Sequence, residues 1–502
     1  MTREKLTGFI LLAIYSSAIA GVLAGVISGF QAGMTIAIMV FCAVFSYKYP
    51  RMGLWALLIY LPFSGTITYA LGNVYRTIGD RITYSPDYAL FHLLKDAFYI
   101  PALIALIQTY KPFKQLQPKA KLLLAGLLVL VAVCLATLLF VNLPQQLQVQ
   151  NKESPFIMGI LGLKELIGYI PLILCSYYLI RNKNDLFFFT RLQVIVILIC
   201  CGLGFLQYLG LVTGLCSGNL SLGGEAINKA SLQARCLVGG SLLYNPELGL
   251  IRLPGTFVAP WQWGWFLISS SFVTYAASTS DPSRRWRLLG WIAMIAVLIM
   301  TILSGQRIAV AIVPATFVFL LLLTDKHKHF LPFKLSIVVL LGVWITRTLS
   351  TVEERLNSFV DRWEASPPLP FMIDQFKWVI QQQDNLLGNG LGRATNAARR
   401  LGETKLIETY YAKLLYEIGP IGMFAFLALV SILTVLTFKA YRSLKNPRLQ
   451  GLGICLWVFI VFISYNTYYY PLAVDPVDIY YWFFIGILLK LPALDTHKEI
   501  QN

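Results

Sequence analysis

The sequence predicts an all-α, polytopic helical membrane protein with about 14 transmembrane helices and one large outer loop. Hydrophobic residues make up 57% of the 502 positions and charged residues only 13%, about half the share that is typical of soluble proteins. Apolar runs of about 20 residues, the length that crosses a bilayer as a helix, recur along the whole chain. Lysines and arginines gather in alternate connections between these runs, which is the pattern of a multi-pass protein.

These runs define the expected elements in chain order. The first follows MTREK without a small-residue cleavage site, so we expect a retained anchor rather than a signal peptide. The fourth is interrupted by Lys95, Asp96 and Pro101 but still has the length of a span. The predicted spans are 7–29, 32–47, 52–70, 90–109, 122–142, 157–180, 192–214, 256–279, 288–303, 308–324, 335–350, 409–438, 451–467 and 478–490.

The distribution of charge predicts which connections face the cytoplasm. If the N-terminus is cytoplasmic, the inner segments hold 23 of the 41 lysines and arginines but only six of the 24 acids. The whole net charge of +17 then lies on the inner side, and both termini are cytoplasmic. Because topology explains this excess, it gives no support to nucleic-acid binding, and no nucleic acid is expected as a partner.

The long connections lie on the predicted outer side. The largest contains a SPPLP breaker followed by apolar residues at helical spacing, which predicts an amphipathic helix on the membrane surface. The apolar residues of this helix are Phe371, Met372, Phe376, Val379 and Ile380. The four long outer segments are 71–89, 143–156, 215–255 and 351–408.

The cysteines predict one disulfide and no metal site. Cys216 and Cys236 share one outer segment, so they are a disulfide candidate in an oxidising compartment. The other six cysteines lie within spans and are expected to be packing residues. No CxxC or Cys/His spacing occurs, so we expect no metal and no other cofactor.

The stretch GNGLG (388–392) allows several interpretations. A dinucleotide-binding turn needs a βαβ unit around it, and the surrounding sequence predicts none. The glycines can instead form a hinge between the surface helix and the next span. Alternatively, they let the backbone approach a phosphate closely.

Five arginines map to the predicted outer side and are candidates for binding an anion. Arginine grips phosphate through a permanently charged, planar fork. Arg307 lies in a very short turn between two spans, where a charge is costly and is usually functional. Snorkelling to lipid headgroups, or pairing with a local acid, is the alternative interpretation. The five are Arg252, Arg307, Arg393, Arg399 and Arg400.

The span that follows the large loop opens with three charges. Lys413 and Glu417 are four residues apart on a helix, so we expect them to neutralise each other as a structural pair. Glu408 is predicted on the opposite face, at the outer end of the helix. It is a candidate general base that positions an acceptor hydroxyl, and the alternative is a helix N-terminal acid favoured by the dipole.

Three segments together resemble the O-antigen ligase/polymerase superfamily of polytopic membrane glycosyltransferases. They are RLPGTFVAPWQWGWFL, the short turn SGQRIAVAI, and DRWEASPPLPFMIDQFKWVIQQQDNLLGNGLG followed by IETYYAKLLYEIGPIG. The resemblance covers roughly residues 250–430. It implies a GT-C-like fold with a ligase/polymerase-like core at 251–438, between an N-terminal transmembrane bundle (1–250) and C-terminal helices with a cytoplasmic tail (439–502).

The resemblance also implies a function. Such proteins transfer or polymerise an undecaprenyl-diphosphate-linked glycan on the periplasmic face of the bacterial inner membrane, without a metal, in O-antigen, lipopolysaccharide or exopolysaccharide biosynthesis. Arg252 and Arg307 would then hold the diphosphate, Arg307 and Glu408 would be catalytic, and Arg393, Arg399, Arg400 and Tyr410 would bind substrate. The implied partners are that donor, a glycan or lipid-linked acceptor, membrane lipids and a chain-length regulator.

One departure and two alternatives accompany this resemblance. Ligases commonly have a histidine at the position of Glu408, so polymerisation or a different acceptor is at least as well supported. A polysaccharide flippase or exporter would place charges at mid-membrane in both halves, and Lys164 and Glu165 are the main candidates in this sequence. A structural membrane scaffold would not need Arg307 in a tight turn.

Overall fold

The computed structural model divides the chain into two compact units. Unit 1 comprises Met1–Pro112, Asn184–Thr274 and Leu288–Ala315, and unit 2 comprises Phe113–Lys183, Tyr275–Arg287 and Thr316–Asn502. The structure describes residues 3–71, 75–78, 81–84, 91, 93–110, 118–148, 153–222, 227, 229–247, 249–325, 332, 336, 357, 360–361, 363–383 and 385–496.

The predicted class is confirmed: the chain is an all-α, multi-pass membrane protein. Within the described residues, ten helices are long and apolar enough to cross a membrane. The predicted number of about 14 spans is not confirmed by this count. The span expected at 335–350 lies outside the described residues.

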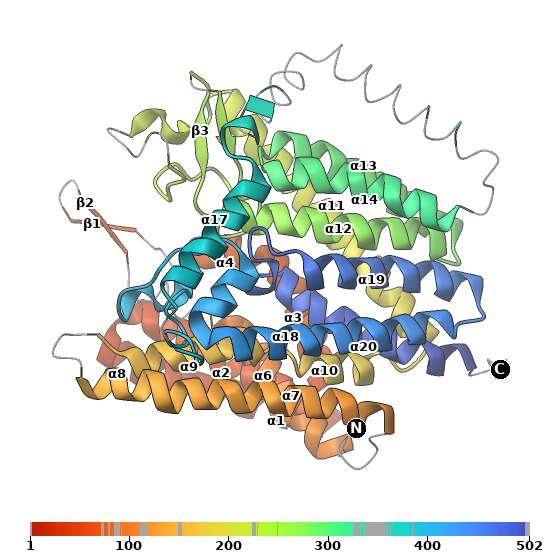
Figure 1. Cartoon of the computed structure of the whole chain (residues 1–502), viewed down its shortest axis with the longest axis horizontal. Coiled ribbons are helices and arrows are strands. Elements are labelled where there is room, and N and C mark those ends of the chain that lie inside the picture. The colour runs from red at the N-terminus through yellow and green to blue at the C-terminus, as the bar shows by residue number, and fades with distance from the viewer. Residues whose placement is uncertain are drawn as a thin grey trace. The chain divides into compact units, whose positions relative to one another are not determined.

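Unit 1 is built mainly from long apolar helices, which Figure 1 labels. Helices α1 and α2 pack against each other, and α6 packs against both α2 and α3. Two short antiparallel hairpins, β1–β2 and β3–β4, lie between the helices in the sequence. The elements are α1 (Arg3–Ser28), α2 (Phe30–Lys48), α3 (Pro50–Tyr60), α4 (Ser64–Leu71), β1 (Tyr75–Ile78), β2 (Arg81–Tyr84), α6 (Leu94–Tyr110), α11 (Lys183–Val212), β3 (Leu243–Asn245), β4 (Leu250–Arg252), α12 (Pro260–Ser280), α13 (Arg284–Leu303) and α14 (Arg307–Thr324). The part of α12 after Thr274, the part of α13 before Leu288 and the part of α14 after Ala315 belong to unit 2.

The segment after α11, which is predicted to lie on the outer side, is held together by several contacts. Cys216 and Cys236 form a disulfide. The side-chain amide of Gln207 donates to the carbonyls of Cys236 and Val238, at 3.1 and 2.6 Å. These contacts join the segment to the end of α11.

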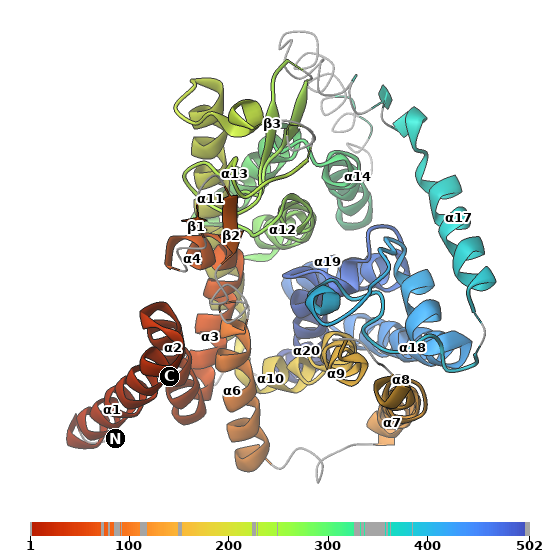
Figure 2. The same ribbon diagram turned by 90° about the vertical axis from the view of Figure 1, so that its left-hand side faces the viewer.

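In unit 2, three C-terminal helices pack together and against helices from earlier in the chain. α18 packs on α7, α19 and α20, while α20 also packs on α10, so segments far apart in the sequence lie side by side (Figure 2). The elements are α7 (Pro118–Thr137), the π-helical turn η3 (Leu138–Asn142), α8 (Leu143–Gln148), α9 (Pro155–Ile167), α10 (Leu172–Leu179), α17 (Pro368–Gln381), η7 (Asn396–Arg400), α18 (Tyr410–Arg442), α19 (Pro447–Tyr465), η8 (Pro471–Ala473) and α20 (Val477–Thr496).

Two spans of unit 2, each predicted as one continuous helix, are broken. The range 157–180 is not one helix, because α9 ends at Ile167 and α10 begins only after Pro171. Inside α18, Gly419 has φ 68° and ψ −178°, and Pro420 follows it. Proline cannot donate the helical hydrogen bond, and glycine tolerates the positive φ, so the helix is interrupted there.

Candidate functional site

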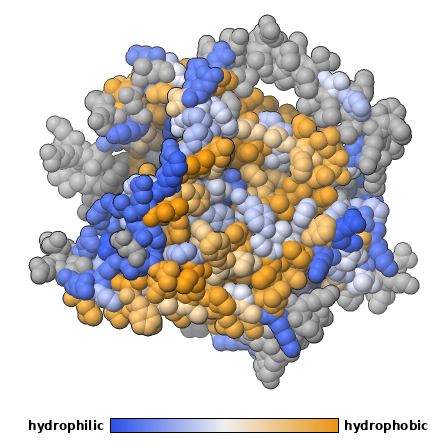
Figure 3. Space-filling model, viewed as in Figure 1, coloured by the Kyte–Doolittle hydropathy of each residue, from blue (hydrophilic) through white to orange (hydrophobic). Residues whose placement is uncertain are grey.

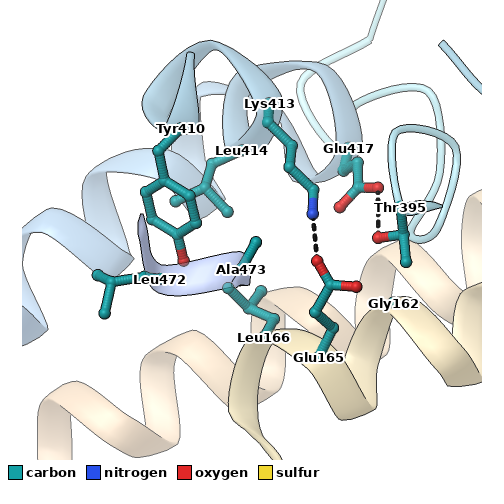
Figure 4. A pocket seen from close by; sticks show the side chains of 10 residues that line it. All are labelled: Gly162, Glu165, Leu166, Thr395, Tyr410, Lys413, Leu414, Glu417, Leu472 and Ala473. Atoms are coloured by element: carbon teal, nitrogen blue, oxygen red, sulfur yellow. Dashed lines mark hydrogen bonds and ion pairs between the residues drawn. The ribbon is translucent and has the colours of Figure 1, made fainter. Parts of the chain in front are cut away.

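A cluster of three charged side chains lies inside unit 2, close to these breaks. Lys413 and Glu417 are on the first two turns of α18, and Glu165 is near the end of α9. The ammonium group of Lys413 donates to Oε1 of Glu165, and the two side chains are only 6% and 24% exposed (Figure 4). Buried charges are tolerated only when they are paired and hydrogen-bonded, and charges inside membrane spans are usually functional.

Glu417 has a different role from the one predicted. It is buried, and its Oε1 accepts hydrogen bonds from the backbone N–H of Ala394 at 2.7 Å and from the hydroxyl of Thr395 at 3.1 Å. The ion pair of Lys413 is formed with Glu165 and not with Glu417, its neighbour four residues along the helix. Glu417 therefore fixes the segment that contains Ala394 and Thr395, while Lys413 joins two helices.

These three charged residues line one small cavity, which Figure 4 shows from close by. Its volume is about 10 Å³, roughly what one water molecule needs. It is therefore a site for a water molecule or a single polar group and not, as it stands, for a sugar. The other lining residues are Gly162, Leu166, Thr395, Tyr410, Leu414, Leu472 and Ala473.

The segment fixed by Glu417, which we call the glycine loop (385–407), packs closely on α9 and α18. A Cβ added to Gly392, whose φ is +83°, would lie 2.1 Å from the carbonyl oxygen of Met158 on α9. Asn142, in the π-helical turn, accepts from the N–H of Leu391 and donates to its carbonyl, both at 3.0 Å. The glycines thus let the loop backbone lie against two helices, so neither the hinge nor the phosphate interpretation is needed to account for them.

The arginines of this loop have different environments. Arg393 donates to Oε1 of Gln145 at 3.1 Å and pairs with Glu153 at 3.2 Å, so it holds the loop to the segment around α8. Arg399 and Arg400 are exposed on η7. Figure 3 shows hydrophilic side chains gathered where α7 ends and α18 begins, and hydrophobic ones along the length of the helices.

An exposed pair of opposite charges also lies in the glycine loop. Glu403 and Lys405 are 2.5 Å apart. The hydrogen bond and charge of Lys405 lower the pKa of the Glu403 carboxyl, and the same contact raises the pKa of Lys405. Because both groups are fully exposed, solvent screens their attraction and the pair adds little to stability.

Glu408 and Tyr410 lie on either side of the start of α18. The helix begins at Tyr410, so Glu408 precedes it and does not share a helical face with the residues that follow. Glu408 is half-buried, and its backbone N–H donates to Oε1 of Gln375 on α17 at 2.9 Å. Tyr410 is buried and lines the cavity, whereas Glu408 is not among the lining residues.

Arg252 and Arg307 belong to unit 1, where the structure brings their turns together. The N–H of Leu253 donates to the carbonyl of Ser304 at 3.0 Å. Both arginine side chains are half-buried. The two arginines therefore lie on neighbouring backbone segments, Arg252 at the end of β4 and Arg307 at the start of α14.

The sequence did not predict that Glu165 and the residues that fix the glycine loop belong to one site. Glu165 was considered only as a transporter candidate, although an acid within an apolar span is itself a signal. Nothing in the sequence pairs it with Lys413, which is 248 residues away. Among the residues that the structure describes, no group of three or more His, Cys, Asp or Glu side chains is arranged to hold a metal ion.

Part of the chain matches a known protein family. Residues 265–471 match the FTSW_RODA_SPOVE family model, described as "Cell cycle protein". The FTSW_RODA_SPOVE match covers less than half of the chain and runs from α12 to the start of η8, so it includes Lys413, Glu417 and the glycine loop but not Glu165. No curated protein matches the chain.

The match to the FTSW_RODA_SPOVE family corrects the resemblance drawn from the sequence. The assignment to the O-antigen ligase/polymerase superfamily is wrong, and so is the function in O-antigen, lipopolysaccharide or exopolysaccharide biosynthesis. The segments that carried the resemblance are short. Their order, hydropathy and sidedness recur among polytopic membrane proteins, because all of them place polar loops between apolar spans.

Proposed function

We propose that the chain handles a lipid-linked precursor of the bacterial cell wall in the cytoplasmic membrane, and that it transfers the precursor's glycan to an acceptor. The FtsW/RodA/SpoVE match points to a peptidoglycan polymerase or a flippase of lipid II, the lipid-linked precursor. The observation that carries the proposal is the buried cluster of Glu165, Lys413 and Glu417. Burying such charges within membrane-spanning helices costs free energy, and charges that are kept there are usually functional.

The chemistry of glycan transfer matches the groups around the cavity. An acceptor hydroxyl attacks the anomeric carbon, the bond to the diphosphate breaks, and the diphosphate leaves on its lipid. The hydroxyl proton needs a base, and we assign this role to Glu165, which is partly exposed and held in one position by Lys413. Glu417 positions the glycine loop and does not itself react.

The basic residues supply charge for the diphosphate. Arg399 and Arg400 are exposed on η7, within the same unit as the cluster, and suit an anionic group. The roles predicted for Arg252 and Arg307 of unit 1, which are to hold the diphosphate and stabilise it as it leaves, stay separate predictions from the sequence. The role of Glu408 as a base remains a competing prediction from the sequence.

A flippase is the second candidate, because a specific observation favours it. Both helices that carry the cluster are broken close to their charges, α9 after Ile167 and α18 at Gly419. Transporters often use discontinuous helices around a polar substrate site within the membrane. In such transporters, one group of helices rocks against another, so that the site opens first to one side of the membrane and then to the other.

The two candidates are separated by supplying lipid II to the purified protein in liposomes. Transfer predicts glycan chains, seen by gel electrophoresis, with release of the lipid diphosphate. Flipping predicts that the headgroup becomes accessible on the opposite face without any longer glycan product. If neither chains nor translocation appear above protein-free liposomes, the proposal is wrong.

A further inference from the structure

The turn that joins α19 to η8 has an unusual backbone. Tyr469 and Tyr470 have φ values of 55° and 34°, in the left-handed region that residues other than glycine seldom adopt. Such a conformation costs free energy and persists only where the surrounding structure enforces it. Two consecutive tyrosines in this region are a reason to look for a role in the side chains that they present.

Contacts with the start of α18 hold the two residues that precede these tyrosines. The N–H of Tyr410 donates to the carbonyl of Thr467 at 2.7 Å, and the N–H of Tyr411 donates to the Thr467 hydroxyl at 3.2 Å. Thr409 and Tyr468 form an isolated β-bridge. The turn is therefore fixed to the helix that carries Lys413, and its last residues lead into Leu472 and Ala473 in the cavity wall.

The rings of this turn form a small aromatic surface. Tyr468 and Tyr469 are in edge contact, with ring centroids 4.5 Å apart, and Phe371 of α17 meets Tyr468 at 6.2 Å. Tyr468 and Tyr469 are half-buried, so neither residue is enclosed in the protein interior. We call Phe371, Tyr468 and Tyr469 the aromatic platform.

Polar groups surround the aromatic platform. Burial raises the pKa of the neighbouring Tyr470, and the carboxylate of Glu408 adds to this effect, which places Glu408 near the turn. The N–H of Glu408 is bonded to Gln375, one helical turn after Phe371. Tyr470 is hydrogen-bonded to Asn396, three and four residues before the exposed Arg399 and Arg400.

We infer that the aromatic platform, with Glu408 and Asn396 beside it, is a binding subsite for a sugar ring of the glycan. One face of a pyranose is made of polarised C–H groups and packs on the electron-rich face of an aromatic ring. Its rim of hydroxyls needs carboxylate and amide partners, which Glu408 and Asn396 supply. This inference rests on the proposed function, because it adds a subsite for the same glycan next to the cavity.

A structural role as a lipid anchor is the competing explanation, because tyrosines are common at membrane interfaces. The two explanations predict different behaviour toward a glycan without its lipid. A sugar subsite binds the soluble glycan released from lipid II. A lipid anchor does not, and its loss affects only the insertion or stability of the protein.

The test compares variants that keep the backbone but change the rings. Tyr469→Asn suits the left-handed conformation while it removes the ring, and Tyr468→Leu keeps an apolar contact for Phe371. Tyr469→Phe keeps the ring. Tyr441→Leu, near the other end of α18, is the matched control.

Binding of intact lipid II and of the soluble glycan is measured on purified protein in lipid nanodiscs. We expect Tyr469→Asn and Tyr468→Leu to weaken binding of the soluble glycan about tenfold, and Tyr469→Phe and Tyr441→Leu to change it less than twofold. If wild type binds lipid II but all variants bind both probes equally, the subsite is wrong and the proposed function stands. If wild type binds neither probe, both are wrong.

Discussion

Lys413 is the residue on which the account of the site depends. Its ammonium group is buried between helices and is compensated by Glu165. Removing one partner of a buried ion pair leaves the other charge in a low-dielectric environment, whereas removing both is often tolerated. Single and double variants of this pair therefore separate its effect on stability from its effect on the reaction.

Lys413→Met should lower the free energy of unfolding by about 3 kcal/mol, because Glu165 is left mostly buried without its partner. The double variant Lys413→Met/Glu165→Met should recover most of this loss but no transfer activity. Thermal unfolding in detergent, measured together with transfer in liposomes, tests both statements. A single variant as stable as wild type would mean that the ion pair is not formed.

Substitution of Arg307, in unit 1, tests whether this residue binds the diphosphate. Arg307→Lys keeps the charge but loses the planar fork, so transfer should fall by about one to two orders of magnitude if this residue grips the diphosphate. The amount of folded protein in the membrane should be unchanged. Wild-type transfer by the variant would instead indicate an anchor to lipid headgroups.

The glycine loop and the two broken helices, α9 and α18, form the site together. Helix positions could be predicted from the sequence because a span needs about 20 apolar residues, and α13 and α14 lie close to their predicted ranges. The break after Ile167 contains Gly168 and Pro171, but both residue types also occur within continuous membrane-spanning helices, so they did not by themselves predict it. The contact of Glu165 with Lys413 depends on tertiary packing, which has no local signal in the sequence.

Gly392→Ala tests whether the packing of the glycine loop on α9 matters. The added Cβ would clash with the carbonyl of Met158, so the loop must shift away from the cavity. We expect a loss of stability about 2 kcal/mol larger than for Gly214→Ala, and at least a tenfold loss of transfer. Gly214 has a similar φ of +75° but nothing within 4 Å, so its variant measures the backbone strain alone. Equal losses in the two variants would show that the loop contact is unimportant.

At the scale of the whole molecule, the proposal requires that the glycine loop lies outside the cytoplasm. Ala397 on η7 and Lys445 between α18 and α19 are both exposed, and α18 separates them. A cysteine at position 397 should react with an impermeant thiol reagent added to intact cells, and one at 445 only after the cells are opened. The reverse labelling pattern would overturn the predicted topology.

The proposed function depends most on whether the cluster around Glu165 performs the transfer. The most direct measurement compares transfer from lipid II by wild type, Glu165→Gln and Glu408→Gln in the same liposomes, with unfolding temperatures as the control for folding. We expect Glu165→Gln to lose about a hundredfold in rate while lipid II binding persists, because the base is removed and its shape is kept. Full activity in Glu165→Gln, together with loss in Glu408→Gln, would contradict the account and return the base to the residue that the sequence favoured.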